Sequence, residues 1–267
     1  MKPIPRITQT AMALLRRLTQ KKFREQEHRF LVEGPHLVEE MLKSDWQIES
    51  VVLRRGNGAE TKFQSLLERA RKSGIKLYET SEREFDKLAD TVTAQGIIAV
   101  ARMRDDDPAL LWGNLRERST IVALNNVSDP GNVGTIIRTC GWFGVDALLV
   151  DQGSVDVYNP KIVRASMGAL FHLKIFPHLD LLQTIVEAKQ HHFSVAVTAL
   201  DGLVEPGRYL FAARTLVVFG NEAHGVHPSI REQADLTLMI PGSGTAESLN
   251  VAVACGIVLH SLRLSQG

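Results

Sequence analysis

Residues 120–139 read TIVALNNVSDPGNVGTIIRT, and this stretch sets the architecture of the second half of the chain. The apolar run that ends in two asparagines predicts a buried strand over 120–126. Pro130 and the glycines around it predict a sharp turn into a helix over 132–143. A strand that runs directly into a helix is the repeating unit of a parallel α/β sheet.

The same pattern continues to the end of the chain. Apolar strands are predicted at 146–152, 193–200, 215–221 and 236–242, with helices at 160–170, 180–191, 227–233 and 247–264. Strands rich in Val, Leu and Ile that alternate with helices indicate a parallel sheet covered on both faces. Ligands bind such sheets beyond the carboxyl ends of the strands. Those ends carry the loops 125–134, 198–202, 220–225 and 241–250.

The first half of the chain is a shorter β/α alternation. Strands are predicted at 48–55, 75–80 and 95–103, and helices at 61–74 and 81–90. The run RDDDPALLWGNLRERS that follows is charged, contains Pro and is typical of a linker. We therefore expect a domain at 1–105, a linker at 106–118 and a second domain at 119–267.

Composition predicts an ordinary cytoplasmic protein. Of the 267 residues, 44% are hydrophobic and 23% are charged, and no apolar run approaches the roughly 18 residues of a membrane span. The first residues lack the apolar core of a signal peptide. Cys140 and Cys255 lie among apolar or small residues, which predicts buried, reduced thiols rather than a disulfide framework.

The net charge of +1 hides an asymmetry between the two halves. Residues 1–105 carry 20 Lys and Arg against 15 Asp and Glu, a net charge of +5, whereas residues 106–267 carry a net charge of −4. Most of the excess lies in the first 30 residues. A basic segment suits a phosphate backbone because neutralised phosphates release counterions. The same basic residues could form a solvent-exposed helix face. Nucleic-acid contact is therefore one of two interpretations of this segment.

Several common sites are excluded by spacing. The chain has neither G-x-G-x-x-G nor G-x-x-x-x-G-K-[ST], the two glycine-rich nucleotide motifs. The two isolated cysteines and the absence of H-E-x-x-H argue against zinc, and GTAES and RASMG lack the spacing of a serine nucleophile elbow. We predict no metal site.

Three motifs together resemble the SpoU/TrmH family of RNA ribose 2′-O-methyltransferases: NNVSDPGNVGTIIRT (125–139), LVVFGNEAHGV (216–226) and IPGSGTAESLNVAVACGI (240–257). NPKIVRASMGALFHL, between the first two, is also typical of the family. FLVEGPHLVEEML and VTAQGIIAVARM are similar to the substrate-binding domain that often precedes the catalytic one. The resemblance covers nearly the whole chain.

The resemblance implies a catalytic domain with a deep C-terminal trefoil knot, an exception to the rule that chains do not knot. It further implies S-adenosylmethionine as cofactor, a homodimer through the C-terminal domain, and a ribosomal-protein-like RNA-binding domain at the N-terminus. By the same resemblance the cofactor contacts are Thr198, Ala199, Leu200, Gly220, Asn221, Ile240 and Leu249. The catalytic residues are Asn132, Arg138, Glu222, Ser248 and Asn250.

Asn132 and Arg138 are six residues apart, about 9 Å along a helix axis. Their angular offset on a regular helix is large, so we expect Asn132 in an irregular stretch at the helix start. Arginine stays protonated in proteins; we therefore expect Arg138 to act as a positioned cation for a phosphate or ribose oxygen, although the family often assigns it the role of base. The RNA contacts predicted are Arg16, Arg17, Lys21, Lys22, Arg24 and Arg164.

Two function classes remain open: an active RNA ribose methyltransferase, and a non-catalytic RNA-binding or ribosome-assembly protein on the same fold. The intact motif residues favour the enzyme. Ribosomal RNA is favoured over transfer RNA because of the N-terminal domain, and the basic charge of that domain disfavours a small-molecule methyltransferase.

Overall fold

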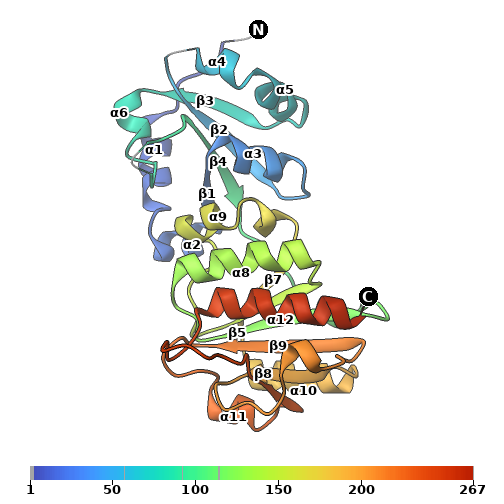
Figure 1. Ribbon diagram of the computed structural model, residues 1–267. Helices are drawn as coiled ribbons and strands as arrows, with labels where there is room; N and C mark the ends of the chain where they lie inside the picture. The colour runs from blue at the N-terminus through green and yellow to red at the C-terminus, as the bar shows by residue number, and fades with distance from the viewer. Residues whose placement is uncertain (1–2, 57, 92, 114, 267) are drawn as a thin grey trace. The chain divides into compact units, whose positions relative to one another are not determined.

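A computed structural model describes residues 3–56, 58–91, 93–113 and 115–266 of the chain (Figure 1). The chain forms two compact units. The first consists of Met1–Asp105 and Tyr158–Phe171, and the second of Asp106–Val157 and His172–Gly267. The segment Tyr158–Phe171, which the sequence places in the C-terminal domain, therefore groups with the first unit.

A parallel sheet forms the centre of the second unit. Within the described residues its six strands are ordered β10-β8-β9-β5-β6-β7, and every pairing is parallel. The strands are β5 (Ser119–Asn125), β6 (Ala147–Asp151), β7 (Lys174–Leu179), β8 (Ser194–Thr198), β9 (Arg214–Gly220) and β10 (Leu236–Leu238). The α/β parallel-sheet prediction is confirmed.

One of these strands was not predicted. β7 contains Pro177, and the next residue, His178, has a positive φ of 61°. Proline removes a ladder donor, so it is tolerated only where a strand has a free side. β7 lies at the edge of the sheet, and its position there explains why its sequence lacks the pattern of a central strand.

Helices cover both faces of the sheet. α8 (Pro130–Phe143) and α12 (Val251–Gln266) pack together on one face, and α10 (Leu181–Gln190) and α11 (Pro228–Arg231) lie on the other (Figure 1). Alternate strand residues such as Ile121 and Ala123 share a buried cluster with Leu181 and Ile185 of α10. Burial of both faces is why the strands are continuously apolar. The unit also contains α7 (Leu110–Gly113), in the expected linker, and the 3-10 turn η2 (Pro206–Arg208); Asn114 of that linker lies outside the described residues.

The first unit has a mixed sheet, which in the described part of the chain runs β1-β4-β2-β3. β4 is antiparallel to β1 and β2, and β2 is parallel to β3. The strands are β1 (Arg29–Glu33), β2 (Ile48–Arg54), β3 (Lys76–Thr80) and β4 (Ile97–Arg102). The helices are α1 (Gln9–Arg17), α2 (Lys21–Glu27), α3 (Pro35–Leu42), α4 (Ala59–Lys62), α5 (Gln64–Lys72), α6 (Glu82–Phe85) and α9 (Pro160–Ala165), with the 3-10 turn η1 (Ala169–Phe171).

Two helix predictions differ from the structure here. The helix expected over 61–74 is divided into α4 and α5 at the buried Phe63, and the one expected over 81–90 ends at Phe85. The grouping of Tyr158–Phe171 with this unit has an aromatic cause. The rings of Tyr158 and Phe171 pack against Phe30 and Trp46, at centroid distances of 4.8 and 5.7 Å respectively.

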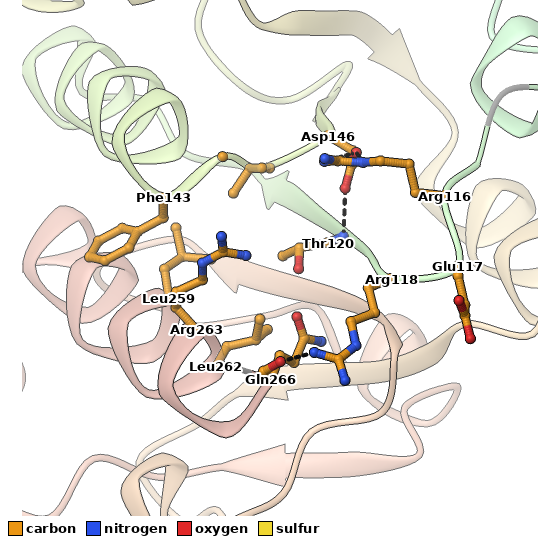
Figure 2. A pocket seen from close by; sticks show the side chains of 12 residues that line it. Arg116, Glu117, Arg118, Thr120, Phe143, Asp146, Leu259, Leu262, Arg263 and Gln266 are labelled. Carbon is orange, nitrogen blue, oxygen red and sulfur yellow. Dashed lines mark hydrogen bonds and ion pairs between the residues drawn. The ribbon is translucent and has the colours of Figure 1, made fainter.

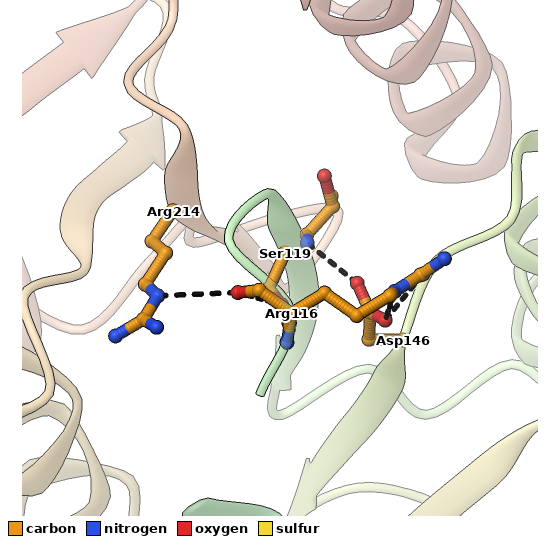
Figure 3. A network of polar contacts seen from close by, with 5 residues as sticks. Arg116, Ser119, Asp146 and Arg214 are labelled. Carbon is orange, nitrogen blue, oxygen red and sulfur yellow. Dashed lines mark hydrogen bonds and ion pairs between the residues drawn. The ribbon is translucent and has the colours of Figure 1, made fainter. Parts of the chain in front are cut away.

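A set of arginines secures the amino-terminal end of the parallel sheet. Asp146 accepts the backbone N–H of Thr120 at 2.8 Å and pairs with Arg116, whose carbonyl accepts the Nε–H of Arg214 at 3.3 Å (Figure 3). A hollow of about 300 Å³ at this end is lined by Arg118 and Arg263 (Figure 2). Arg118 donates to the carbonyl of Gln266, in the last turn of α12. Cations there offset the negative end of the helix dipole, so these arginines have a structural function.

Cys140 on α8 and Cys255 on α12 are both fully buried and unbridged, as predicted. Burial raises the pKa of the Cys140 thiol, and a hydrogen bond with Cys255 adds to the effect. Because the thiolate is the reactive form, an aromatic disulfide reagent is expected to label neither thiol in the folded protein and both after denaturation in guanidinium. Absorbance of the released thiolate measures both stages. Rapid labelling of either thiol in the native state would contradict this burial.

Candidate active site

A cavity of about 770 Å³ opens at the carboxyl ends of β8, β9 and β10. This is the edge of the sheet at which a parallel α/β fold binds its ligands. The structure places all seven residues predicted to contact the cofactor on its walls: Thr198, Ala199, Leu200, Gly220, Asn221, Ile240 and Leu249. Glu222 and Ser248 line it too. Three loops that are more than 15 residues apart in sequence, 198–202, 220–225 and 241–250, therefore meet around one hollow.

Gly220 is required by close backbone packing. A Cβ at this position would overlap the backbone of Gly225 and Val226, because β9 turns back on itself immediately after the glycine. The turn is closed by hydrogen bonds between Asn221 and Gly225, at 3.0 Å from the N–H of Asn221 and 2.8 Å from that of Gly225. A bare α-carbon thus permits the tight turn that brings Glu222 to the cavity.

The side chain of Asn221 serves this turn. Its Oδ1 accepts the N–H groups of Ala223 and His224 at 2.9 and 3.1 Å, and its Nδ2 donates to the carbonyl of Asn126 at 3.0 Å. These contacts engage both ends of the amide. Asn221 lines the cavity as predicted, but its side chain organises the loop.

Backbone donors are available on the cavity wall. In the part of the chain that the structure describes, the N–H groups of Leu200, Ile240 and Leu249 have no hydrogen-bond partner. Apolar side chains, including Phe219, Val226 and Leu238, supply much of the rest of the lining. An apolar cavity with a few directed main-chain donors suits a flat heterocycle with acceptors at its rim.

An ion pair lies on the cavity wall. Arg231 Nη2 donates to Asp201 Oδ2 at 2.8 Å, and both residues line the cavity. This hydrogen bond lowers the pKa of Asp201 below its ordinary value. The Arg231–Asp201 pair joins the loop after β8 to α11.

Three of the predicted catalytic residues form a hydrogen-bonded chain. Asn250 Nδ2 donates to Asn132 Oδ1 at 2.9 Å, and Asn132 Nδ2 donates to Glu222 Oε1 at 2.6 Å. The acceptor at the end is a carboxylate, which makes the second bond charge-assisted. We call this the Asn250–Asn132–Glu222 chain. Each amide keeps one further N–H for a ligand.

Helix ends hold the two asparagines in place. Asp129 caps α8 by accepting the N–H of Asn132 at 2.8 Å, and Asn250 Oδ1 accepts the N–H groups of Ala252 and Val253 at 2.9 and 3.3 Å. The prediction that Asn132 lies in an irregular stretch at the helix start is wrong, because α8 begins at Pro130 and Asn132 is in its first turn. Ser248 and Leu249 precede α12, which begins at Val251, so Asn250 alone opens that helix.

A partly buried carboxylate that the sequence analysis missed, Asp151, supports the loops after β5 and β6. Asp151 accepts from Asn125 Nδ2 at 2.9 Å, from the N–H of Asn126 at 3.0 Å and from Ser154 Oγ at 2.6 Å. Asn125 Oδ1 in turn accepts the N–H of His227 at 2.8 Å. Asn126 has a φ of 58°, in the left-handed region. The sequence signal for these contacts was an asparagine pair at the end of one strand and an aspartate at the end of the next.

Arg138 lies apart from this chain. It is exposed on α8, and it makes no hydrogen bond or ion pair with any residue that the structure describes. On a regular helix its side chain points about 120° away from that of Asn132. The structure thus brings Asn132, Glu222 and Asn250 together, places Ser248 on the same cavity, and leaves the Arg138 guanidinium facing solvent.

Comparison with known proteins identifies the family of the chain. The SpoU rRNA Methylase family matches residues 119–260, more than half of the chain, and the MRM3-like substrate binding domain matches residues 11–99. The chain belongs to the SpoU rRNA methylase family. As a family member it is an RNA 2′-O-methyltransferase with S-adenosylmethionine as its cofactor.

Relatives of the SpoU family match along nearly the full length. The 23S rRNA (guanosine(2553)-2′-O)-methyltransferase RlmP of Bacillus subtilis (strain 168) is 35% identical, over 93% of this chain and 94% of the relative. The 23S rRNA (guanosine-2′-O-)-methyltransferase RlmB of Acinetobacter baylyi is 30% identical, over 85% and 94%. An AdoMet-bound rRNA methyltransferase structure from Sinorhizobium meliloti superposes with a TM-score of 0.85 at 27% identity, over 98% and 97%.

The cavity of this SpoU-family chain fits S-adenosylmethionine. Its volume lies in the range of small-molecule sites, roughly 300–1,000 Å³. The free N–H groups of Leu200, Ile240 and Leu249 offer donors for an adenine ring, and the apolar residues offer its faces a dry surface. Within the described residues no cluster of three or more His, Cys, Asp or Glu could hold a metal ion, and no helix is long and apolar enough to cross a membrane.

The basic residues predicted to contact RNA differ in exposure. Arg24 is 2% exposed, and its Nη1 donates to the carbonyls of Leu18 and Thr19 at the end of α1. Its function in this SpoU-family chain is therefore structural. Arg16 pairs with Glu84, and Arg164 pairs with Asp90 at 2.6 Å.

Three others keep exposed cationic ends. Arg17 is exposed over the ring of Phe23 at 3.9 Å, Lys21 lies 3.6 Å from Glu25, and Lys22 is exposed. The surface formed by α1 and α2 is thus less basic than the sequence suggests, because Arg16 and Arg24 bind other groups of the protein.

Proposed function

We propose that this enzyme methylates a ribose 2′-hydroxyl of ribosomal RNA. The observation that carries the proposal is the Asn250–Asn132–Glu222 chain beside a cavity that fits S-adenosylmethionine. The ribosomal target is supported by two 23S rRNA methyltransferase relatives at 35% and 30% identity and by the match of residues 11–99 to a substrate-binding domain. The net charge of +5 on residues 1–105 suits a polyanion.

The protein's own groups would bind and orient the ribose. When bound, S-adenosylmethionine supplies a methyl group on a positively charged sulfur. The second N–H groups of Asn132 and Asn250 and the hydroxyl of Ser248 would hold the ribose oxygens, since the Ser248 hydroxyl has no partner among the described residues. Glu222 fixes the orientation of Asn132. Orientation of the hydroxyl for in-line attack supplies much of the acceleration.

We assign Arg138 to an RNA phosphate beside the reacting ribose. Arg138→Ala is expected to lower kcat/KM about 100-fold, and Arg138→Lys to recover less than a tenth of the loss, since a lysine lacks the bidentate fork. Steady-state methylation measures both. Arg263→Ala, which removes another exposed arginine, on α12, serves as the control and should leave kcat/KM unchanged. Near-normal turnover by the lysine variant would contradict bidentate binding.

We further propose a homodimer paired through α8 and α12. Trp142 is 84% exposed at the end of α8, and Val253 and Ile257 form an exposed apolar pair one turn apart on α12. The two helices pack side by side, with Thr139 beside Gly256. Sedimentation should show a dimer that Trp142→Glu converts to monomer. A wild-type monomer at micromolar concentration would contradict this.

We also propose that residues 106–118 link two domains, that the protein works in the cytoplasm and that the C-terminal segment forms a trefoil knot. The knot is supported by close backbone packing between the loop after β8 and the segment after β10. A Cβ on Gly202 would lie 2.6 Å from the carbonyl carbon of Leu238, and Met239 donates to the carbonyl of Val204 at 2.9 Å. Residues 241–250 then lead back to α12 beside α8.

Methyl transfer from labelled S-adenosylmethionine tests the function. The substrate is total RNA from cells that lack the protein, separated by size, with the modified nucleotide mapped by mass spectrometry. We expect a 2′-O-methyl group at one position of a large ribosomal RNA. Label in the transfer-RNA fraction would support methyl transfer to RNA but would contradict ribosomal RNA as the substrate. Cofactor binding without incorporation into free RNA or ribosomal subunits would favour the non-catalytic RNA-binding alternative.

A further inference from the structure

A groove in the first unit has no part in the function proposed above. It has a volume of about 690 Å³ and lies between the N-terminal residues Pro3–Pro5, the end of α5 and the start of β3. Its apolar lining comes from Ile4, Ile75 and Leu77. Its basic lining comes from Arg71, Lys72 and Lys76, and its remaining lining residues are Glu68 and Tyr78. Proteins bind single-stranded nucleic acid with a basic groove that follows the phosphates and an aromatic side chain on which a base stacks, and this groove combines basic residues with Tyr78 and an apolar floor.

The cations of this groove form no ion pair within the described part of the chain, unlike Arg16 of α1 and Lys21 of α2. Residues 69–76 contain four basic residues and no acidic one. Lys72 and Lys76 are exposed, and neither forms an ion pair with a residue that the structure describes. The one acidic lining residue, Glu68, accepts a hydrogen bond from Gln64 Nε2 at 3.0 Å. The groove therefore has a positive potential that the protein does not neutralise internally.

Arg71 adds a second observation. Its Nη2 is buried and makes no hydrogen bond with any described residue. A buried guanidinium donor without a partner is unfavourable, and a small rotation of the side chain toward an anion in the groove would satisfy it. Unlike Arg24, whose guanidinium caps a helix, Arg71 has no structural partner that explains its position.

The backbone around the groove disfavours a peptide. β3 is an edge strand, but its edge is already occupied by the N-terminal segment. Ile7 donates to the carbonyl of Glu79 at 3.0 Å, and Glu79 donates to the carbonyl of Pro5 at 2.9 Å. An extended peptide binds an edge through free main-chain groups, and at Glu79 those of β3 are already bonded to the N-terminal segment. The basic and apolar side chains of the groove therefore carry the recognition that we consider, as they do for a phosphate backbone.

We propose that the groove between α5 and β3 binds a single-stranded segment of the RNA substrate other than the methylated nucleotide. Arg71, Lys72 and Lys76 contact its phosphates, and the apolar floor takes an unpaired base. This inference rests on the proposed function, because the RNA is the same molecule that the cavity methylates. The groove would then act as an anchor: it would raise the affinity for RNA and take no part in methyl transfer.

A charge reversal tests the anchor. Lys72→Glu with Lys76→Glu is expected to weaken binding of unmodified, in vitro transcribed large-subunit ribosomal RNA at least tenfold in a filter-binding assay. The KM for RNA should rise by a similar factor while kcat and the Kd for S-adenosylmethionine stay unchanged. The slope of log K against log salt should fall by about two, because two phosphate contacts are lost. Both lysines are exposed, so the variant should fold, which circular dichroism checks.

The matched control is Lys43→Glu with Lys87→Glu, the same charge change in the same unit. Those lysines pair with Glu40 and Glu84 at 2.8 and 2.7 Å, and this variant should keep RNA affinity within about threefold, since exposed pairs contribute little. An equal loss of RNA affinity in both variants would show that net charge alone causes the effect. That result would overturn the proposed role of the groove. Wild-type affinity in the groove variant, with normal methylation, would overturn it as well.

Crosslinking gives an independent readout. RNA containing 4-thiouridine should crosslink to the stretch 71–78, identified by peptide mass spectrometry. Crosslinks confined to α1 and α2 would overturn the proposal. Competition by polyglutamate as strong as that by RNA would show a general anion site and overturn the base contact. If wild-type enzyme methylates no RNA at all, the proposed function fails, whereas loss of the crosslink alone counts against the groove.

Discussion

Asn132→Ala is expected to lower kcat by about 10²–10³-fold, the effect of removing one preorganised polar group from an active site. The side chain joins the amide of Asn250 to the carboxylate of Glu222, 118 and 90 residues away in sequence. Without it, both partners lose the hydrogen bond that orients them and the ribose loses a donor. The Kd for S-adenosylmethionine should change far less than kcat because Asn132 itself does not line the cavity. Single-turnover methylation and calorimetry measure the two quantities.

Two further variants separate chemistry from folding. Thr135→Ala removes an exposed hydroxyl one turn later on α8, which donates to the carbonyl of Gly131 at 2.8 Å, and should leave kcat unchanged. Asn132→Asp keeps the shape but places a carboxylate against Glu222, so it should be as inactive as alanine. Near-normal kcat in the aspartate variant would show that the site needs only the volume of the side chain and that the hydrogen-bonded chain is dispensable.

Gly220→Ala is expected to abolish detectable binding of S-adenosylmethionine and to destabilise the fold by about 3 kcal/mol, the upper range for forced overpacking. The new methyl group would overlap the backbone of Gly225 and Val226, and backbone moves less easily than a side-chain tip. The turn at 221–225 must then open, which displaces Glu222 and the cavity wall. Thermal unfolding and isothermal titration test the two effects.

Gly242→Ala is the matched control for this substitution. Gly242 lines the same cavity, but no atom lies within 4 Å of a Cβ built there and its φ is not in the left-handed region. It should retain the wild-type Tm and bind the cofactor within a fewfold of wild type. If Gly220→Ala were as stable as Gly242→Ala, the close packing that we assign to β9 and its turn would be wrong.

Much of the second unit could be predicted from local pattern. Strands such as β5 and β9 are continuous apolar runs, and a strand buried on both faces has no other way to be stable. The loops that line the cavity stand at the ends of those strands, so their residues could be named from sequence. β7 was missed because an edge strand tolerates a proline and follows no burial pattern on its open side.

Other features depend on partners that are distant in sequence. The regular start of α8 at Pro130 follows from the Asp129 cap, a local signal that was overlooked. The burial of Arg24 could not be predicted from local sequence, because the carbonyls that it caps belong to the end of another helix, α1. Asp151 likewise gains its function only where β5 and β6 end side by side.

By itself the sequence determined which segments are apolar enough to be buried and which strand ends carry polar groups, because hydrophobic period and turn chemistry are local properties. Only the tertiary structure decided which polar groups meet. Asn132, Glu222 and Asn250 form one chain because a parallel sheet places the ends of β5 and β9 next to each other and α12 packs beside α8. A hydrogen bond requires its donor and acceptor within about 3 Å, and spacing along the chain does not encode that distance.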